Sequence, residues 1–584
     1  MDLPFGPRYN IGIDVGGTNT DGVLYDCVDK RIAASVKIPT EHASYAKAID
    51  NALKALISGI DHKRSEVVSL NISTTVSTNA LLEDKGEPSN LILIGFDRYP
   101  HIVSDIERAI APSSVLRVRG GHTGWGKERE TFDTRTVENY AKDHRGESFT
   151  VSSMYSPRNP RHETAAKEIL LANGSGHVTC SHELSYSRLN SVKRTVTAYL
   201  NTSLVPLAER LIKNIGSVEK KYGLSCPVMF LRSDSTLVPS EWCRRFPIEM
   251  IYSGPAASLR GACHIAGGDS SDSFVVVDIG GTSTDIGRIY LGRAVFSEEG
   301  AKIGAYRTMI PSLDIMSIAL GGDSRTEVCG IGDIRMGPER SVPFCMAAQN
   351  SGFQADKVIN DLLGHPDDVP RAAGLGKWMS MGYSYTPTDA FNTMELSEAG
   401  DPDISKAVSC LTGKMAGASG CDLAKAVAVK AHSMLESSIS EYTSECGQLP
   451  RVYVGAPAKA FAKLGDECEP GVTVPLNFDV AGAVGAAVSS IELNCRVSIM
   501  HSFSDESFTA FLPETTISSE NFQELLETAE KAAGKYLARL AGSMGYDEII
   551  ITAEKALSYA GDTENFSTLL SASIECRAVV KNAQ

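Results

Sequence analysis

One eight-residue pattern occurs twice in this 584-residue chain, and it constrains the fold more than any other feature. Residues 14–21 read DVGGTNTD and residues 278–285 read DIGGTSTD, so six of the eight positions are identical. Each copy begins at the end of an apolar run, YNIGIDV in the first case and FVVVDI in the second, as is typical of a buried strand. A repeat in the same strand–turn–strand setting predicts two structurally related lobes.

The residue types in the repeated turn suit phosphate binding. Glycine lets the backbone approach an anion closely, and successive backbone N–H groups can form a concave anion site. A pair of purely structural β-turns is the alternative, and the double occurrence makes it the weaker one. The candidate phosphate-binding residues are Gly16, Gly17, Thr18, Asn19 and Thr20 in the first turn and Gly280, Gly281, Thr282, Ser283 and Thr284 in the second.

Four aspartates bracket these turns: Asp14 and Asp21 in the first copy, Asp278 and Asp285 in the second. A carboxylate repels phosphate, so we expect these side chains to hold Mg²⁺ (or Mn²⁺) or to orient an attacking group. The chain has no G-x-x-x-x-G-K-[ST], G-x-S-x-G or H-E-x-x-H segment, which argues against Walker A nucleotidases, α/β-hydrolases and zinc proteases.

Charge and composition exclude further classes. The chain carries 56 Lys and Arg against 71 Asp and Glu, a net charge of −15, and so lacks the basic footprint of nucleic-acid binding. No apolar stretch reaches the roughly 18 residues of a membrane-spanning helix, and the start, MDLPFGPRYN, lacks a secretory signal pattern. The 13 cysteines include no C-x-x-C pair. We therefore expect a cytoplasmic protein with reduced thiols and no nucleic-acid or membrane partner.

The turns and four further segments together carry a family resemblance. The paired turns look like the two phosphate loops of the actin/Hsp70/sugar-kinase superfold. More narrowly, residues 8–495 resemble the hydantoinase A/5-oxoprolinase family. The segments that carry this narrower likeness are TTVSTNALLE (74–83), MIYSGPAASLRGA (250–262), SIALGGDS (317–324) and NFDVAGAVGAAV (477–488).

The resemblance implies an α/β fold in which two related actin-like (ribonuclease H-like) lobes surround a nucleotide cleft. We expect the lobes at residues 1–190 and 191–495. A helical run followed by two strand-like runs predicts a small α+β C-terminal domain at residues 496–584.

The resemblance also implies an activity, because family members use ATP to open cyclic amides such as hydantoins and 5-oxoproline. It predicts a hydrolase that phosphorylates a carbonyl oxygen. In this interpretation Asp14 and Asp278 position Mg²⁺ and the phosphates, Thr78 and Asn79 face the reacting centre, and Gly321 and Gly322 approach the nucleotide. A hydantoinase B-like partner subunit is expected, and homo-oligomerisation is left open.

Two departures from the family pattern keep alternatives open. Asp323 stands where the family has glycine, and residues 453–465 lack the family's histidine. The alternatives are a small-molecule kinase of the same superfold and a non-catalytic nucleotide-binding subunit of a hydantoinase- or carboxylase-like complex. His122, in RGGHTGWG, and His182, in SHEL, are candidate acid–base groups or metal ligands, although loop histidines are more often simply solvated.

Overall fold

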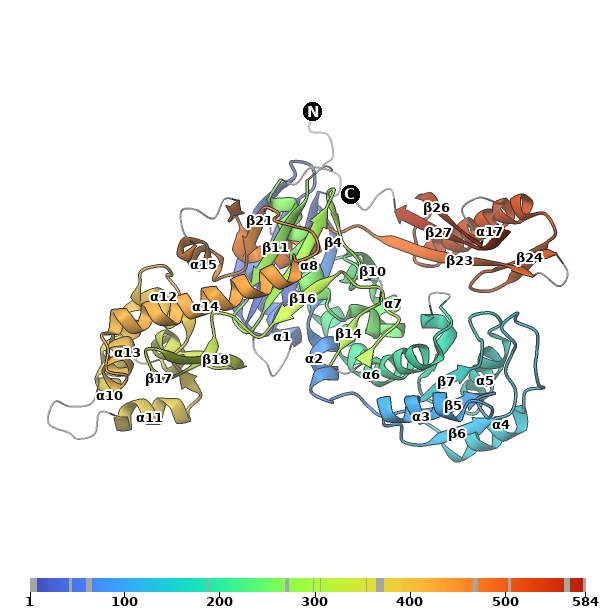
Figure 1. Cartoon of the computed structure of the whole chain (residues 1–584), viewed down its shortest axis with the longest axis horizontal. Helices are drawn as coiled ribbons and strands as arrows, with labels where there is room; N and C mark the ends of the chain where they lie inside the picture. The colour runs from blue at the N-terminus through green and yellow to red at the C-terminus, as the bar shows by residue number, and fades with distance from the viewer. Residues whose placement is uncertain are drawn as a thin grey trace.

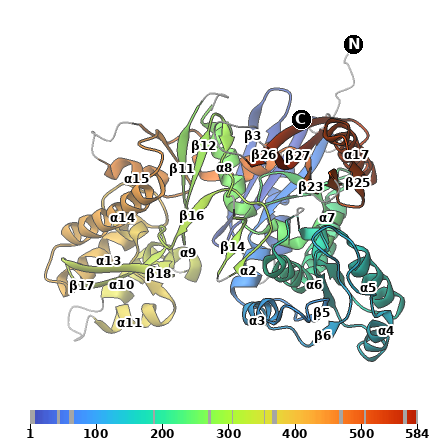
Figure 2. The same ribbon diagram turned by 45° about the vertical axis from the view of Figure 1, so that its right-hand side comes forward.

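The chain folds into two lobes, a four-stranded parallel unit and a C-terminal domain (Figures 1 and 2). The computed structural model describes residues 8–40, 45–58, 66–185, 188–267, 272–297, 299–304, 306–352, 354–363, 372–465, 471–502, 506–560 and 568–580. The first seven residues of the chain, part of the segment used above to judge a secretory signal, lie outside these ranges.

The first lobe is a six-stranded sheet with strand order β10-β9-β4-β1-β2-β3. Helices α1 (Tyr45–Ile57) and α6 (Ser191–Tyr222) pack their apolar residues against it. The strands are β1 (Tyr9–Val15), β2 (Asn19–Asp26), β3 (Arg31–Pro39), β4 (Val67–Thr74), β9 (Val228–Leu231) and β10 (Leu237–Pro239).

The second lobe repeats the central hairpin of the first. Its sheet has the order β13-β12-β11-β21-β22, and β16 pairs with β12. Its strands are β11 (Phe274–Ile279), β12 (Thr284–Tyr290), β13 (Arg293–Ala294), β16 (Ile315–Ile318), β21 (Arg451–Val454) and β22 (Val472–Thr473).

The two hairpins have equivalent registers. Asp14 lies opposite Asp21 in the β1–β2 pair, as Asp278 lies opposite Asp285 in the β11–β12 pair. A parallel strand then follows on the other side of the first strand of each pair, β4 beside β1 and β21 beside β11. The predicted relation between the lobes is therefore present in the strand pairing.

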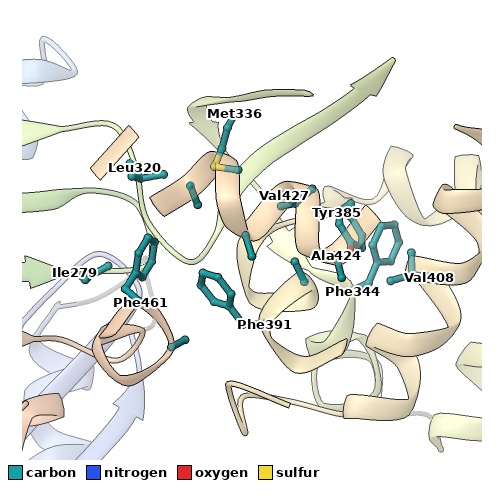
Figure 3. Packing of buried hydrophobic residues seen from close by; sticks show 14 of the residues in the cluster. Ile279, Leu320, Met336, Phe344, Tyr385, Phe391, Val408, Ala424, Val427 and Phe461 are labelled. Atoms are coloured by element: carbon teal, nitrogen blue, oxygen red, sulfur yellow. The ribbon is translucent and has the colours of Figure 1, made fainter. Parts of the chain in front are cut away.

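An apolar core supports the outer part of the second lobe (Figure 3). Phe344, Phe391 and Phe461 are buried in it, together with Ile279 from the end of β11. This core therefore anchors the strand that leads into the second turn. The elements around it are the hairpin β17 (Ser324–Gly330) and β18 (Asp333–Arg340) and the helices α12 (Pro387–Thr393), α13 (Pro402–Met415), α14 (Gly420–Tyr442) and α15 (Ala458–Leu464).

Two helices rich in small residues join the lobes, α8 (Ser253–Ile265) and α16 (Ala481–Val488). They touch backbone to backbone: a Cβ atom on Gly261 would overlap the carbonyl oxygen of Ala481, and one on Gly485 would overlap that of Ala257. The small residues of the 250–262 and 477–488 segments thus have a packing reason.

The parallel unit has the strand order β6-β5-β7-β8. Helix α3 (Pro100–Ala109) packs against α6, whereas α4 (Thr134–Asp143) packs against α5 (Arg161–Ala172). The unit is therefore a doubly wound sheet with helices on both faces. Its strands are β5 (Asn90–Ile94), β6 (Val115–Val118), β7 (Phe149–Ser153) and β8 (Val178–Cys180).

The C-terminal domain is a five-stranded antiparallel sheet of order β25-β24-β23-β27-β26, with α17 (Phe522–Ser543) packed on its apolar face. The predicted fold class, two related lobes and a small α+β C-terminal domain, is confirmed. The limits 1–190, 191–495 and 496–584 stay predictions, and residues 228–239 belong to the first sheet. The strands are β23 (Glu492–Ser502), β24 (Ser507–Phe511), β25 (Thr516–Ser519), β26 (Ile549–Ala560) and β27 (Thr568–Val580).

Among the described residues, no helix combines the length and the apolar character that crossing a membrane would require.

Candidate active site

The two Gly-Gly-Thr turns are closed by equivalent hydrogen bonds. The N–H of Gly16 donates to the carbonyl oxygen of Asn19 at 3.0 Å, and the N–H of Gly280 donates to that of Ser283 at 2.9 Å. Thr20 and Thr284 are fully buried, with their hydroxyls bonded inside the protein, to Thr40 and to the carbonyl of Leu320. These two hydroxyls therefore brace the turns. The other predicted phosphate-binding residues of the turns are at least partly exposed: Gly16, Gly17, Thr18, Asn19, Gly280, Gly281, Thr282 and Ser283.

The turns of the two lobes face each other at close range. A Cβ atom on Gly281 would lie 3.1 Å from the Thr18 hydroxyl oxygen and 2.6 Å from a carboxylate oxygen of Asp323. The glycine-rich segment runs along the second turn, where the N–H of Gly322 donates to the carbonyl of Gly280 at 3.0 Å. The structure thus brings together residues 16–20, 280–284 and 321–323.

Asp14 lies where the first turn meets both junction helices. Its Oδ2 would overlap a Cβ atom on Gly482 of α16, and its Oδ1 is 3.9 Å from the position of a Cβ on Gly254 of α8. Oδ1 is buried and has no hydrogen-bond partner in the described chain. Burial raises the pKa of Asp14 to about 7. The Ser73 hydroxyl opposes this shift, whereas the nearby Asp21 and Asp278 add to it.

Burial also raises the pKa of the other three aspartates. Asp21 reaches about 6, although the Lys37 ammonium at 2.6 Å opposes the shift. Asp285, which accepts a hydrogen bond from Ser317, reaches about 7. Asp278 is also raised, and a Cβ on Gly455 would lie 2.7 Å from its Oδ1. Four carboxylates with raised pKa values make a site that a cation would stabilise.

The donor set fits a hard, oxygen-seeking cation. It consists of carboxylates, and they do not form a group of three ligand atoms within 4.8 Å, so no closed cage exists. An open site of this kind suits Mg²⁺, which retains waters and takes phosphate oxygens as ligands. We expect Asp14 to be the main protein ligand, because Asp21 and Asp285 already have polar partners.

The described residues contain one compact candidate metal cluster, Glu163, Cys180 and His182, in the parallel unit. The Glu163 carboxylate already accepts hydrogen bonds from the Ser153 N–H, the Ser181 hydroxyl and the N–H and Nδ1 of His182. Arg194 lies 3.5 Å away as a counter-ion. This cluster is saturated, so it is better explained as a structural network.

Two basic residues beside the facing turns, Lys37 and Arg340, were not predicted from the sequence. Lys37 lies opposite Asp21 in the β2–β3 register and pairs with it. Arg340 ends β18, with Nη2 at 3.4 Å from an Asp323 carboxylate oxygen and Nη1 at 3.5 Å from the carbonyl of Gly17. Burial raises the pKa of Asp323, and Arg340 opposes that shift. Asp323, the residue that departs from the family pattern, therefore has Arg340 as its counter-ion. Lys37 could have been found from the register of the β2–β3 hairpin, which places it opposite Asp21.

Thr78 and Asn79 lie on α2 (Val76–Leu82), directly after β4. The Thr78 hydroxyl accepts a hydrogen bond from the N–H of Tyr252 at 3.0 Å, just before α8. Asn79 donates to the hydroxyl of Thr75, which in turn donates to the carbonyl of Val15. Both residues therefore connect to the elements around Asp14. Their catalytic roles stay predictions. His122 and His182 lie in the parallel unit instead.

Two lobes built on the same hairpin, with paired Asp-Gly-Gly-Thr turns facing each other across their junction, define a protein of the actin-like ATPase superfold. The sequence model of the hydantoinase/oxoprolinase N-terminal region matches residues 10–174, and that of hydantoinase/oxoprolinase matches residues 194–395. The chain belongs to the hydantoinase/oxoprolinase family.

Known relatives agree with this assignment. The chain is 27% identical to caprolactamase subunit alpha of Pseudomonas jessenii over 353 residues, which are 57% of this chain and 50% of that one. A solved structure of the ATP-dependent caprolactamase from Pseudomonas jessenii has a TM-score of 0.71 at 20% identity, covering 98% of this chain and 87% of that chain. Nucleotide-free acetone carboxylase has a TM-score of 0.70 at 15% identity, covering 99% and 88%. The match to the first curated relative spans about half of that relative's length.

Proposed function

We propose that this protein is the ATP-using component of an enzyme that opens a cyclic amide of the hydantoin, 5-oxoproline or lactam type. The observation that carries the proposal is the pair of equivalent turns, facing each other beside an aspartate whose buried Oδ1 has no partner. Membership of the hydantoinase/oxoprolinase family supports the same assignment.

In this proposal ATP supplies the phosphoryl group that activates the amide carbonyl oxygen. The chain's own residues bind and orient. Backbone N–H groups of residues 17–18 and 281–282 hold the phosphates, because those of Gly16 and Gly280 already close the turns. Lys37 and Arg340 supply positive charge that offsets the repulsion between the phosphates and this acidic protein of net charge −15. Asp14, with Asp278 nearby, would hold Mg²⁺, and the ion would neutralise phosphate charge. Catalysis then rests on positioning and charge neutralisation.

Asn79 and Thr78 are proposed to lie beside the reacting amide, since α2 begins directly after the strand next to Asp14. Overall, ATP and water are consumed, and ADP, phosphate and a ring-opened amino acid are released. We also propose that a hydantoinase B-like partner completes the enzyme. The relative from Pseudomonas jessenii supports this, because it is named as the alpha subunit of its enzyme.

The test is a coupled assay of ADP release with 5-oxoproline, hydantoin or caprolactam, with and without a hydantoinase B-like partner. A cyclic amide should stimulate ADP release and yield the ring-opened acid together with inorganic phosphate. Asp14→Asn should remove this stimulation. A stable phosphorylated product would instead identify a kinase, and a protein that binds no nucleotide by calorimetry would refute the proposal.

A further inference from the structure

The parallel unit, which the proposed function does not use, has a topological switch point. The chain runs from β5 to β6 on one side of β5, and it then crosses to β7 on the other side. The helix after β5 packs with α6 on one face, while α4 and α5 pack together on the other face. In doubly wound sheets, ligands bind outside the carboxyl ends of the strands where the direction of winding reverses.

A cavity of about 530 Å³ lies at this edge. Its wall combines three segments that the topology brings together: Tyr99, His101 and Ile102 after β5, Met154 and Tyr155 after β7, and residues 189–192 at the start of α6. This volume is in the range of roughly 300–1,000 Å³ that small-molecule sites occupy. Most of the lining side chains are aromatic or aliphatic, so the wall suits an apolar body.

The start of α6 adds free hydrogen-bond donors to this wall. The side-chain oxygen of Asn190 caps the 32-residue helix by accepting a hydrogen bond from the N–H of Lys193. The N–H groups of Ser191 and Val192 have no acceptor in the described chain. Unpaired N–H groups in the first turn of a long helix favour an anion, through direct hydrogen bonds and through the helix dipole.

The hairpin that follows β6 borders the same edge and carries buried polar atoms without partners. His122 is only 1% exposed, and neither its Nδ1 nor the Thr123 hydroxyl forms a hydrogen bond in the described chain. A Cβ on Gly124 would lie 3.6 Å from the Tyr155 ring, which places the hairpin beside the cavity wall. His122 and Thr123 are not lining residues of the cavity, and the His122 ring packs against that of His162 with 4.2 Å between the centroids, so their unpartnered atoms are not assigned to the ligand.

Arg129 is not itself a lining residue, but it lies beside Tyr99, which is one. The Arg129 guanidinium lies 5.8 Å from the centre of the Tyr99 ring and donates to the carbonyl of Gly95 at 3.0 Å, while Asp97 is a looser partner at 3.6 Å. Its Nε is buried without a partner. Tyr155, another lining residue, has a left-handed backbone with φ of 58°. Such strain in a non-glycine residue clusters at ligand sites.

We propose that this cavity is a second binding site, separate from the cleft between the turns, for a small carboxylic acid with an aromatic or aliphatic body. The body packs between Tyr99, Met154 and Tyr155. The carboxylate accepts hydrogen bonds from the N–H groups of Ser191 and Val192. Arg129, beside Tyr99, adds positive charge near the site. The site is independent of the proposed activity, because none of its residues belongs to the two turns.

The test compares phenylacetate with its neutral isostere phenylacetamide, by calorimetry and saturation-transfer NMR on the full chain without nucleotide. The acid should bind at least tenfold more tightly than the amide. Ser191→Pro removes one N–H donor at a position where helices accept proline, and it should lower this preference about tenfold. Ser191→Ala, which keeps the N–H group, should retain the preference.

Ile102→Trp fills the cavity and should abolish binding of both probes, whereas Asp14→Asn should leave binding unchanged. Equal binding of acid and amide to the unaltered protein, or binding of neither, would overturn the proposal. So would acid binding that survives Ile102→Trp or that disappears in Asp14→Asn, since the latter would place the probe in the cleft. The Ile102 variant tests the site even if Ser191→Pro does not fold.

Discussion

Gly321 lies directly against Gly281, so that a Cβ atom on Gly321 would overlap the carbonyl oxygens of Gly281 and Gly280. The glycine-rich segment and the second turn therefore pack backbone against backbone. The N–H of Asp323 donates to the carbonyl of Gly281 at 2.7 Å, which fixes the register of the two segments.

Gly321→Ala should consequently disrupt the second turn. Neither backbone segment can move without breaking this pairing, and overpacking of this kind costs about 1–3 kcal/mol. We expect a lower thermal unfolding midpoint and weaker ATP binding by calorimetry. Gly17→Ala is the matched control, because a Cβ on Gly17 would meet nothing within 4 Å. Equal loss of stability in both variants would show that the contact is unimportant.

Asp14→Asn should stabilise the protein at pH 8 while it removes the proposed activity. Burial raises the pKa of Asp14 to about 7 from its ordinary value of 3.8. Between these values the folded protein binds a proton that the unfolded chain has lost, so stability falls as pH rises. The neutral amide avoids this cost, and we expect a gain on the order of 1–2 kcal/mol above pH 7 that vanishes below pH 4.

Denaturant unfolding at pH 5 and pH 8 would measure this effect. Asp26→Asn is a control of opposite sign. Burial alone would raise the pKa of Asp26, but hydrogen bonds from Arg8 and from the N–H groups of Asp29 and Val28 outweigh it and hold the pKa low. Its ionised form therefore stabilises the fold above about pH 4, and the substitution should destabilise it at pH 8. If Asp14→Asn is also destabilising at pH 8, the assigned pKa direction is wrong.

Arg340→Gln should weaken ATP binding. The guanidinium contacts both Asp323 and the carbonyl of Gly17, so its loss leaves a partly buried carboxylate unpaired beside the phosphate turns. Losing a charge-assisted contact of about 1.5–3 kcal/mol corresponds to a rise of roughly tenfold or more in the KM for ATP. The additional change Asp323→Asn should recover part of the loss, because the repulsive charge is then gone.

Arg335→Gln is the control, since Arg335 lies on the same strand but is exposed, and its one ion-pair partner among the described residues is Asp333 at 3.8 Å. Steady-state ADP release at varied ATP would separate KM from kcat. Equal KM values for the Arg340 and Arg335 variants would rule out a nucleotide-facing role for Arg340.

The sequence predicted those features that local pattern determines. The DxGGT repeat was enough to predict both hairpins. The segments 250–262 and 477–488 were singled out only by family resemblance, and the backbone-to-backbone packing of α8 and α16 was not predicted. The sequence could not predict which side chains from distant segments contact one another. Arg340 is one basic residue among many until the β17–β18 hairpin places it beside Asp323 and Gly17. The cavity at the switch point likewise combines residues from three separate segments.

Arg158 is expected to hold the C-terminal domain against the parallel unit. Its guanidinium lies 4.0 Å from the centre of the Phe511 ring of β24, and it donates to the sulfur of Met500 of β23. The side chain is 8% exposed and forms no ion pair in the described chain, and burial lowers its pKa to about 10. A desolvated cation–π contact of this kind contributes about 2 kcal/mol.

Arg158→Ala should therefore loosen the domain contact without unfolding either part. Hydrogen exchange followed by mass spectrometry should show faster exchange in β23 and β24, while β1 and β11 stay protected. Arg161→Ala is the control, because Arg161 lies three residues away on the surface. Arg158→Lys should recover only part of the protection, since the ammonium lacks the planar face that stacks on the ring. Unchanged exchange in β23 and β24 of the alanine variant would show that other contacts hold the domain.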